Sequence, residues 1–96
     1  MPYRIVLTEN AVADFNGLDA RLRATVRDSL RLHLAHEPAK ESRSRIKKVR
    51  DLRHPQFRLR IGEIGVFYDV TETDVVIIAI ISKEKTIEWL KEHATR

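Results

Sequence analysis

Apolar and polar side chains alternate along three stretches of the chain, and a fourth stretch is apolar throughout. Alternation with a period of two is typical of a β-strand with one buried face. The fully apolar stretch is rich in β-branched residues, which is typical of a strand in the middle of a sheet that helices cover. We therefore predict strands at residues 3–7, 57–61, 64–70 and 75–81, with Gly62 and Glu63 forming the turn of a hairpin.

Two helices are predicted between the first two of these strands. Thr8 and Asp19 are suited to cap their N-termini, because each side-chain oxygen can accept a hydrogen bond from the first helical turn. Along residues 22–34 an apolar side chain recurs every four positions, and Pro38 ends that helical stretch. A third helix is predicted after the apolar strand.

The predicted order is β-α-α-β-β-β-α, which indicates one α+β domain spanning residues 1–96. In this fold a helical hairpin packs on one face of an antiparallel-rich sheet. Residues 46–52 carry apolar side chains three apart, and periodicity does not resolve their structure. Residues 46–52 could form either a short strand or an irregular basic segment.

Positive charge is concentrated in one part of the chain. The net charge is +4, but residues 40–60 alone carry +7, so the remainder sums to −3. Clustering of this kind is typical of a surface that binds an anionic polymer. A solvated surface and an acidic protein partner are the alternatives.

Composition narrows the classes of protein further. Hydrophobic residues make up 43% of the chain and cysteine is absent, so we expect a globular domain with no disulfide. No apolar run approaches the roughly 20 residues that span a bilayer, and the first residues lack the apolar core of a signal peptide. We expect a cytoplasmic location and no membrane partner.

The histidines offer little metal chemistry. His33 and His36 lie three apart on the predicted second helix, but no third ligand accompanies them, so no metal site is predicted. His54 is the one histidine inside the basic segment and is a candidate acid or base. No glycine-rich phosphate loop and no Ser-His-Asp set is present, so no cofactor is predicted.

Arg58 and Arg60 share one face of the strand at residues 57–61, and apolar side chains occupy the other face. Fixed cations on a rigid sheet are suited to hold a phosphate backbone. The longer stretch FRLRIGEIGVFYDV, residues 57–70, resembles the RelE/ParE family of bacterial toxins. The family phrase is roughly aromatic-Arg-Leu-Arg-Val-Gly-acidic-aromatic-Arg-Val-hydrophobic-Tyr. The opening Tyr3-Arg4-Ile5 and the helical hairpin also fit, so the resemblance covers nearly the whole chain.

The resemblance implies the toxin of a type II toxin–antitoxin system, inhibited by a cognate acidic antitoxin in a hetero-oligomeric complex. The RelE branch is implied to cleave mRNA on the ribosome, by attack of a ribose 2′-hydroxyl on the adjacent phosphate. That reaction needs a base, positive charge and a proton donor. Arg58 and Arg60 match two basic positions of the family. Lys85 matches a position where the RelE branch prefers arginine.

Other residues complete the predicted site. Lys48, within the cationic cluster, and Glu63, beside the turn, are candidate bases, since arginine does not readily give up a proton. Backbone contacts to RNA are predicted for Lys47, Arg50 and Arg53. Trp89 is a candidate for stacking on a base, with packing of the last helix on the sheet as the alternative.

Gly65 departs from the family pattern. It stands where the family usually places an arginine that contacts the scissile phosphate, and losing one such group costs about 3 kcal/mol of transition-state stabilisation. The departure implies attenuated or lost cleavage, unless the glycine marks a bend or bulge in the strand. The tyrosine found near the C-terminus of several members is also missing.

Three functions therefore follow from the resemblance. The first is a ribosome-dependent mRNA endonuclease, or mRNA interferase. The second is a ParE-like inhibitor of DNA gyrase, which needs no nuclease site. The third is a non-catalytic module that binds the antitoxin and acts as a transcriptional co-repressor.

Overall fold

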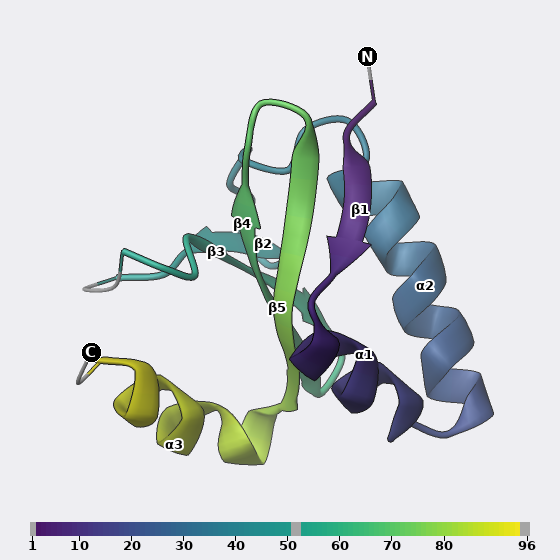
Figure 1. The fold of residues 1–96 in the computed structure, drawn as a ribbon, viewed down its shortest axis with the longest axis vertical. Helices are drawn as coiled ribbons and strands as arrows, with labels where there is room; N and C mark the ends of the chain where they lie inside the picture. Colours follow the sequence, from purple (N-terminus) through teal and green to yellow (C-terminus); the bar gives the residue numbers. More distant parts are fainter. Residues whose placement is uncertain (1, 51–52, 95–96) are drawn as a thin grey trace.

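The computed structural model describes residues 2–50 and 53–94, which form a five-stranded sheet and three helices (Figure 1). The strand order across the sheet is β1-β5-β4-β3-β2. The strands are β1 (Arg4–Leu7), β2 (Ile46–Lys48), β3 (Phe57–Ile61), β4 (Ile64–Val70) and β5 (Asp74–Ser82). The helices are α1 (Glu9–Asn16), α2 (Ala20–Leu34) and α3 (Lys83–Ala94).

The sheet confirms the predicted antiparallel-rich α+β fold. β1 pairs in parallel with β5, and every other neighbouring pair is antiparallel. The structure adds one strand to the predicted order, because Ile46–Lys48 pairs with β3. The short-strand alternative is therefore correct for the start of the 46–52 segment, whereas residues 51 and 52 lie outside the described part of the chain.

The two predicted helix caps are confirmed. The Thr8 hydroxyl accepts a hydrogen bond from the Ala11 N–H at 3.2 Å, and an Asp19 carboxylate oxygen accepts one from the Leu22 N–H at 2.8 Å. These bonds satisfy backbone donors that the first helical turn leaves unpaired. Residues 17–19 form the short connection between α1 and α2.

The core lies between α1, α2 and one face of the sheet. Val26 and Leu30 of α2 pack in one buried cluster with Leu59 of β3 and with Val66 and Tyr68 of β4. The buried Tyr68 hydroxyl donates a hydrogen bond to the Pro38 carbonyl at 2.7 Å, and burial raises the pKa of this tyrosine. We call this side of the sheet the core face.

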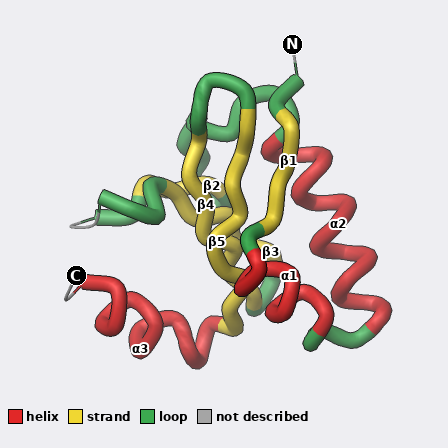
Figure 2. Tube along the Cα trace, viewed as in Figure 1, coloured by secondary structure: helices red, strands yellow, loops and turns green. Residues whose placement is uncertain are grey.

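The opposite side of the sheet, the open face, carries Arg58, Arg60, Gly65 and Phe67 of β3 and β4. Figures 1 and 2 show α2 to the right of the sheet and α1 below the end of β1, whereas α3 leaves the end of β5 and runs to the left. Trp89 of α3 packs on Phe67 with ring centroids 4.8 Å apart. This contact holds α3 on the open face, in line with the packing alternative for Trp89.

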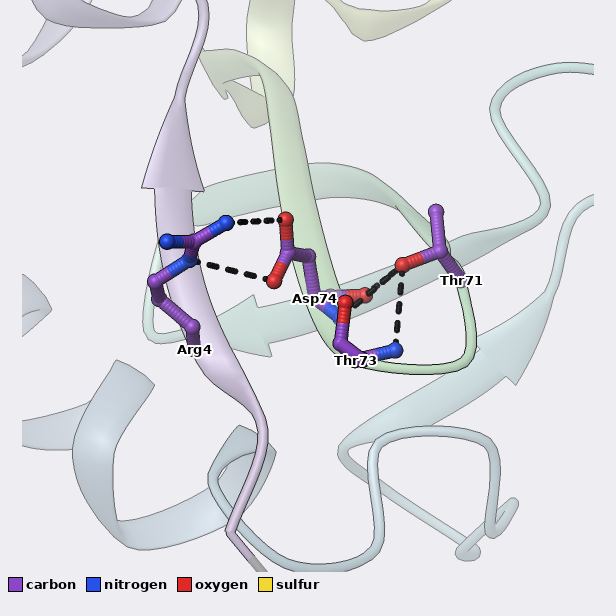
Figure 3. A network of polar contacts seen from close by, with 4 residues as sticks. All are labelled: Arg4, Thr71, Thr73 and Asp74. Carbon is purple, nitrogen blue, oxygen red and sulfur yellow. Dashed lines mark hydrogen bonds and ion pairs between the residues drawn. The ribbon is translucent and has the colours of Figure 1, made fainter.

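An ion pair closes the end of the sheet where β1 meets β5. Arg4 makes two hydrogen bonds to the Asp74 carboxylate, at 3.1 and 3.2 Å (Figure 3). The Thr71 hydroxyl accepts hydrogen bonds from the N–H groups of Thr73 and Asp74, which fixes the turn that leads into β5. The hydrogen bond from Arg4 holds the pKa of Asp74 below its ordinary value.

Candidate functional site

Strand register gathers cations on the open face. Arg58 lies directly opposite Phe67, and Arg60 directly opposite Gly65. Residues that oppose one another in an antiparallel pair share a face of the sheet. Lys47 of β2 opposes Arg58, so its side chain belongs to the same face. The prediction that the two arginines share a face is confirmed, and Lys47 joins them.

The glycine at position 65 is part of a regular ladder. Gly65 pairs with Arg60 on one side and with Ile81 on the other, and the irregularity in β4 pairing comes later, between Phe67 and Tyr68. The bulge alternative for Gly65 is therefore wrong. A Cβ at this position would lie 3.6 Å from Cδ of Arg58 and 3.3 Å from a ring carbon of Phe67. The contact with Arg58 would be an ordinary van der Waals contact, whereas the edge of the Phe67 ring would have to shift by a few tenths of an ångström.

Arg58 carries an unusual donor. Its Nε atom is buried and has no hydrogen-bond partner among the described residues. Burial, together with the nearby charge of Arg60, lowers the pKa of Arg58. A buried donor without a partner costs about 1–3 kcal/mol, and more when the group is charged. A bound anion that reaches this N–H would remove that cost.

A cleft of about 250 Å³ opens beside the two arginines, between the β3–β4 hairpin and the first turns of α3. Its floor includes Gly65, and its α3 wall includes Lys83 and Thr86. The Lys83 N–H donates a hydrogen bond to the Glu63 carbonyl at 2.7 Å, which ties the start of α3 to the hairpin turn. The lining residues are Arg58, Arg60, Gly62, Glu63, Ile64, Gly65, Lys83, Thr86 and Ile87.

Two lysines predicted as catalytic lie elsewhere. Lys85 lines a separate groove between α1, β5 and α3, so Lys83 is the α3 lysine that shares the cleft with the arginines. Lys48 opposes Phe57, whose ring stacks on Tyr68, and therefore belongs to the core-face side of β2. The structure does not bring either residue to the arginines.

Among the remaining predicted residues, Glu63 lines the cleft, whereas Arg50, Arg53 and Trp89 do not. Arg50 and Arg53 are exposed in the connection between β2 and β3. Glu63 is exposed in the hairpin turn at the rim of the cleft. Trp89 is half-buried against Phe67.

A histidine–carboxylate pair also lies on the open face. His54 Nδ1 is 2.9 Å from an Asp69 carboxylate oxygen, and the other oxygen accepts a hydrogen bond from the Gln56 N–H at 2.8 Å. Asp69 follows Phe67 by two positions in β4 and so shares its face. The sequence singled out His54, but it gave no sign of Asp69, because the two residues meet only through the pairing of β3 and β4.

His33 also has a defined contact. Its Nε2 lies 3.2 Å from Nη1 of Arg45, and burial and the arginine charge lower the pKa of His33. In the described parts of the chain, no three His, Cys, Asp or Glu side chains are placed to hold a metal ion. None of the described helices is both long and apolar enough to cross a membrane.

The fold and site define a class of protein, a small α+β domain with a cationic cleft between the open face of its sheet and the start of α3. Two of the solved structures that share this fold are chains of toxin–antitoxin complexes. The chain is similar to one in the RelBE2 toxin–antitoxin complex of Mycobacterium tuberculosis, with 26% identity, a TM-score of 0.67, and coverage of 85% of this chain and 99% of that one.

Two further structures share the fold at lower identity. One is the RelB–RelE antitoxin–toxin complex of Methanococcus jannaschii, with 12% identity, a TM-score of 0.60, and coverage of 88% of this chain and 96% of that one. The other is a conserved hypothetical protein of Helicobacter pylori, with 16% identity, a TM-score of 0.60, and coverage of 85% and 96%. No protein-family model and no curated protein matches the chain. The chain has the fold of RelE-type toxins, and this similarity supports a toxin role.

Proposed function

We propose that this protein is the toxin of a type II toxin–antitoxin pair and acts as a ribosome-dependent mRNA endonuclease. The observation that carries the proposal is the cleft beside Arg58, where a buried guanidinium N–H has no partner in the described parts of the chain and Arg60 and Lys83 add charge. A phosphate group in this cleft would accept that N–H in a charge-assisted hydrogen bond. Similarity to chains of two RelBE complexes supports the toxin role and an antitoxin partner.

The proposed activity is attenuated rather than absent. Gly65 supplies no cation to the phosphate, but Lys83 lines the same cleft from α3. The cleft reaches Gly65, so an arginine at this position can extend into it once the Phe67 ring edge moves slightly. We expect Gly65→Arg to raise the cleavage rate by about 100-fold, the scale of one oxyanion-stabilising donor.

The test is a reconstituted translation reaction in which the 5′ ends of the mRNA are mapped. Cuts within ribosome-bound mRNA, absent when ribosomes are omitted and suppressed by a cognate acidic antitoxin, are the expected result. The absence of cuts with both the wild-type protein and Gly65→Arg would rule out the nuclease.

One observation favours a second function. Because Gly65 removes a cation from the cleft, a toxin that binds DNA gyrase and needs no nuclease chemistry is the alternative. Inhibition of supercoiling by the purified protein, with mRNA left intact, would establish that alternative.

A further inference from the structure

The His54–Asp69 pair has a fixed proton arrangement. His54 Nδ1 lies 2.9 Å from the Asp69 carboxylate. A carboxylate only accepts hydrogen bonds, so Nδ1 carries the proton and the lone pair of a neutral ring is on Nε2. The His54 side chain is 60% exposed, whereas that of Asp69 is 21% exposed. The ring is therefore accessible while the carboxylate behind it is sheltered.

Asp69 is held in place independently of the histidine. Its second oxygen accepts the Gln56 N–H at 2.8 Å, and the Gln56 side-chain oxygen accepts the Val70 N–H at 2.9 Å. These bonds join the end of β4 to the residue before β3. A histidine oriented by a carboxylate that other groups hold is the arrangement that enzymes use for proton transfer.

The pair lies within reach of the cationic cleft along the same face. Arg58 opposes Phe67, and Asp69 is two positions further along β4, which makes Arg58 and Asp69 diagonal neighbours. Such neighbours are about 7–8 Å apart on one face of a sheet. A nucleic acid strand bound at Arg58 can therefore present an adjacent ribose to His54.

We propose that His54 is the proton acceptor for the 2′-hydroxyl in RNA cleavage, oriented by Asp69; this rests on the nuclease function proposed above. His54 Nε2 takes the 2′-hydroxyl proton as the 2′-oxygen bonds to the adjacent phosphorus. The bond from phosphorus to the 5′-oxygen breaks, and that oxygen takes a proton from water. The resulting hydroxide removes the proton from the imidazolium. The products are a 2′,3′-cyclic phosphate and a 5′-hydroxyl end, and the histidine is regenerated.

This assignment supplies the base that the two arginines cannot provide, since guanidinium groups keep their protons. Lys48 is on the other side of β2, and Glu63 lies in an exposed turn. His54 is the candidate on the open face that a second group orients. Imidazole is also the side chain that enzymes use most often for this step.

Two substitutions test the role without removing the Asp69–Gln56 bond. His54→Gln deletes the imidazole, and we expect cleavage of ribosome-bound mRNA to fall by at least about 100-fold, the usual contribution of a general base. In Asp69→Asn the Gln56 N–H requires the amide oxygen, so the amide NH₂ faces Nδ1 and moves the ring proton to Nε2. We expect a similar loss of cleavage rate for Asp69→Asn, and no further loss in the double variant.

His36→Ala is the matched control, because His36 is exposed away from the open face. The cleavage rate of His36→Ala should equal that of the wild-type protein.

Nitrogen NMR of the histidine rings provides a readout that does not depend on turnover. We expect the proton on Nδ1 of His54 in the wild-type protein and on Nε2 in Asp69→Asn. Wild-type cleavage that survives His54→Gln would overturn the role of His54 alone. No cleavage by either the wild-type protein or Gly65→Arg would overturn the nuclease function and this role with it.

Discussion

At the scale of single residues, Arg58 carries a cost in the free protein that the proposed binding of RNA would remove. Its Nε–H is buried without a partner among the described residues, and its stem lies across the glycine at position 65. Buried donors left unpaired lower stability, and binding of an ion is one of the explanations for such a group in a native structure. The stability of the free protein should therefore improve when this donor is removed.

The first prediction concerns Arg58→Met, which keeps a long apolar stem and removes the guanidinium. We expect the free energy of unfolding to rise by about 1–2 kcal/mol, because the unsatisfied donor disappears, while binding to single-stranded RNA weakens. Urea denaturation and fluorescence anisotropy measure the two effects. Arg60→Met is the control for stability, since Arg60 is exposed and its removal should change the unfolding free energy by less than about 0.5 kcal/mol. A loss of stability in Arg58→Met would contradict this view of the cleft.

The sequence indicated the type of side chain in the site better than its exact position. Arg58 and Arg60 were predictable because a strand places alternate residues on one face. Lys83 was not predicted. Lys85 was chosen because it matches a basic position of the RelE branch, and only the packing of α3 on the sheet shows that Lys83, and not Lys85, lines the cleft.

At the scale of secondary-structure elements, the ion pair between β1 and β5 makes stability depend on pH. Arg4 lowers the pKa of Asp74 in the folded protein. A carboxylate with a lowered folded pKa stabilises the protein above its unfolded pKa, and this contribution disappears as the pH falls through the folded pKa. Both side chains are at the end of the sheet, so the effect is local to this strand pair (Figure 3).

The second prediction follows from the direction of this pH dependence of stability. Asp74→Asn should be less stable than the wild-type protein at neutral pH, and the difference should shrink as the pH is lowered below about 4. Urea unfolding at a series of pH values measures it. Glu72→Gln, in the adjacent turn, is the control and should show no such convergence. A difference that stays constant with pH would mean that the ion pair does not stabilise the fold.

The structure of β2 depends on its pairing with β3, which the sequence of residues 46–48 does not specify. Residues 46–48 were compatible with a strand or an irregular segment, and the pairing of Ile46 with Leu59 decides between them. That pairing buries Ile46 in the core and so assigns the next two lysines to opposite faces. Register is a tertiary property, which is why Lys48 looked as suitable as Lys47 before the fold was known.

The third prediction uses these neighbouring lysines as a matched pair. Lys47→Ala should reduce the slope of log affinity against log salt concentration for single-stranded RNA by about 0.7, the value for one phosphate contact. Lys48→Ala should leave the slope unchanged, because its side chain is on the core-face side of β2. Equal changes in both variants would show that binding responds to net charge and not to the open face.

At the scale of the whole molecule, the helices cover the two faces of the sheet differently. α1 and α2 cover the core face, whereas α3 lies on the open face and packs Trp89 on Phe67. The fold distributes the positive charges of residues 40–60 over different sides of the molecule. Some of these cations line the open face, and others, such as Arg45 beside His33, are directed toward α2.

The fold was therefore largely predictable and the site only in part. Period-two alternation and two good helix caps specify the layers, because burial of one face per element leaves few arrangements. The cleft and the His54–Asp69 pair depend on which residues meet across strands and at the start of α3. These contacts arise from the assembled sheet, so they were visible only in the structure.

The central claim is that the open face binds and cleaves RNA on the ribosome. It is tested most directly by mapping 5′ ends of mRNA in a reconstituted translation reaction with the wild-type protein and Gly65→Arg. We expect ribosome-dependent cuts with 5′-hydroxyl ends, weak for the wild-type protein and about 100-fold faster for Gly65→Arg. Intact mRNA in both reactions would contradict the claim.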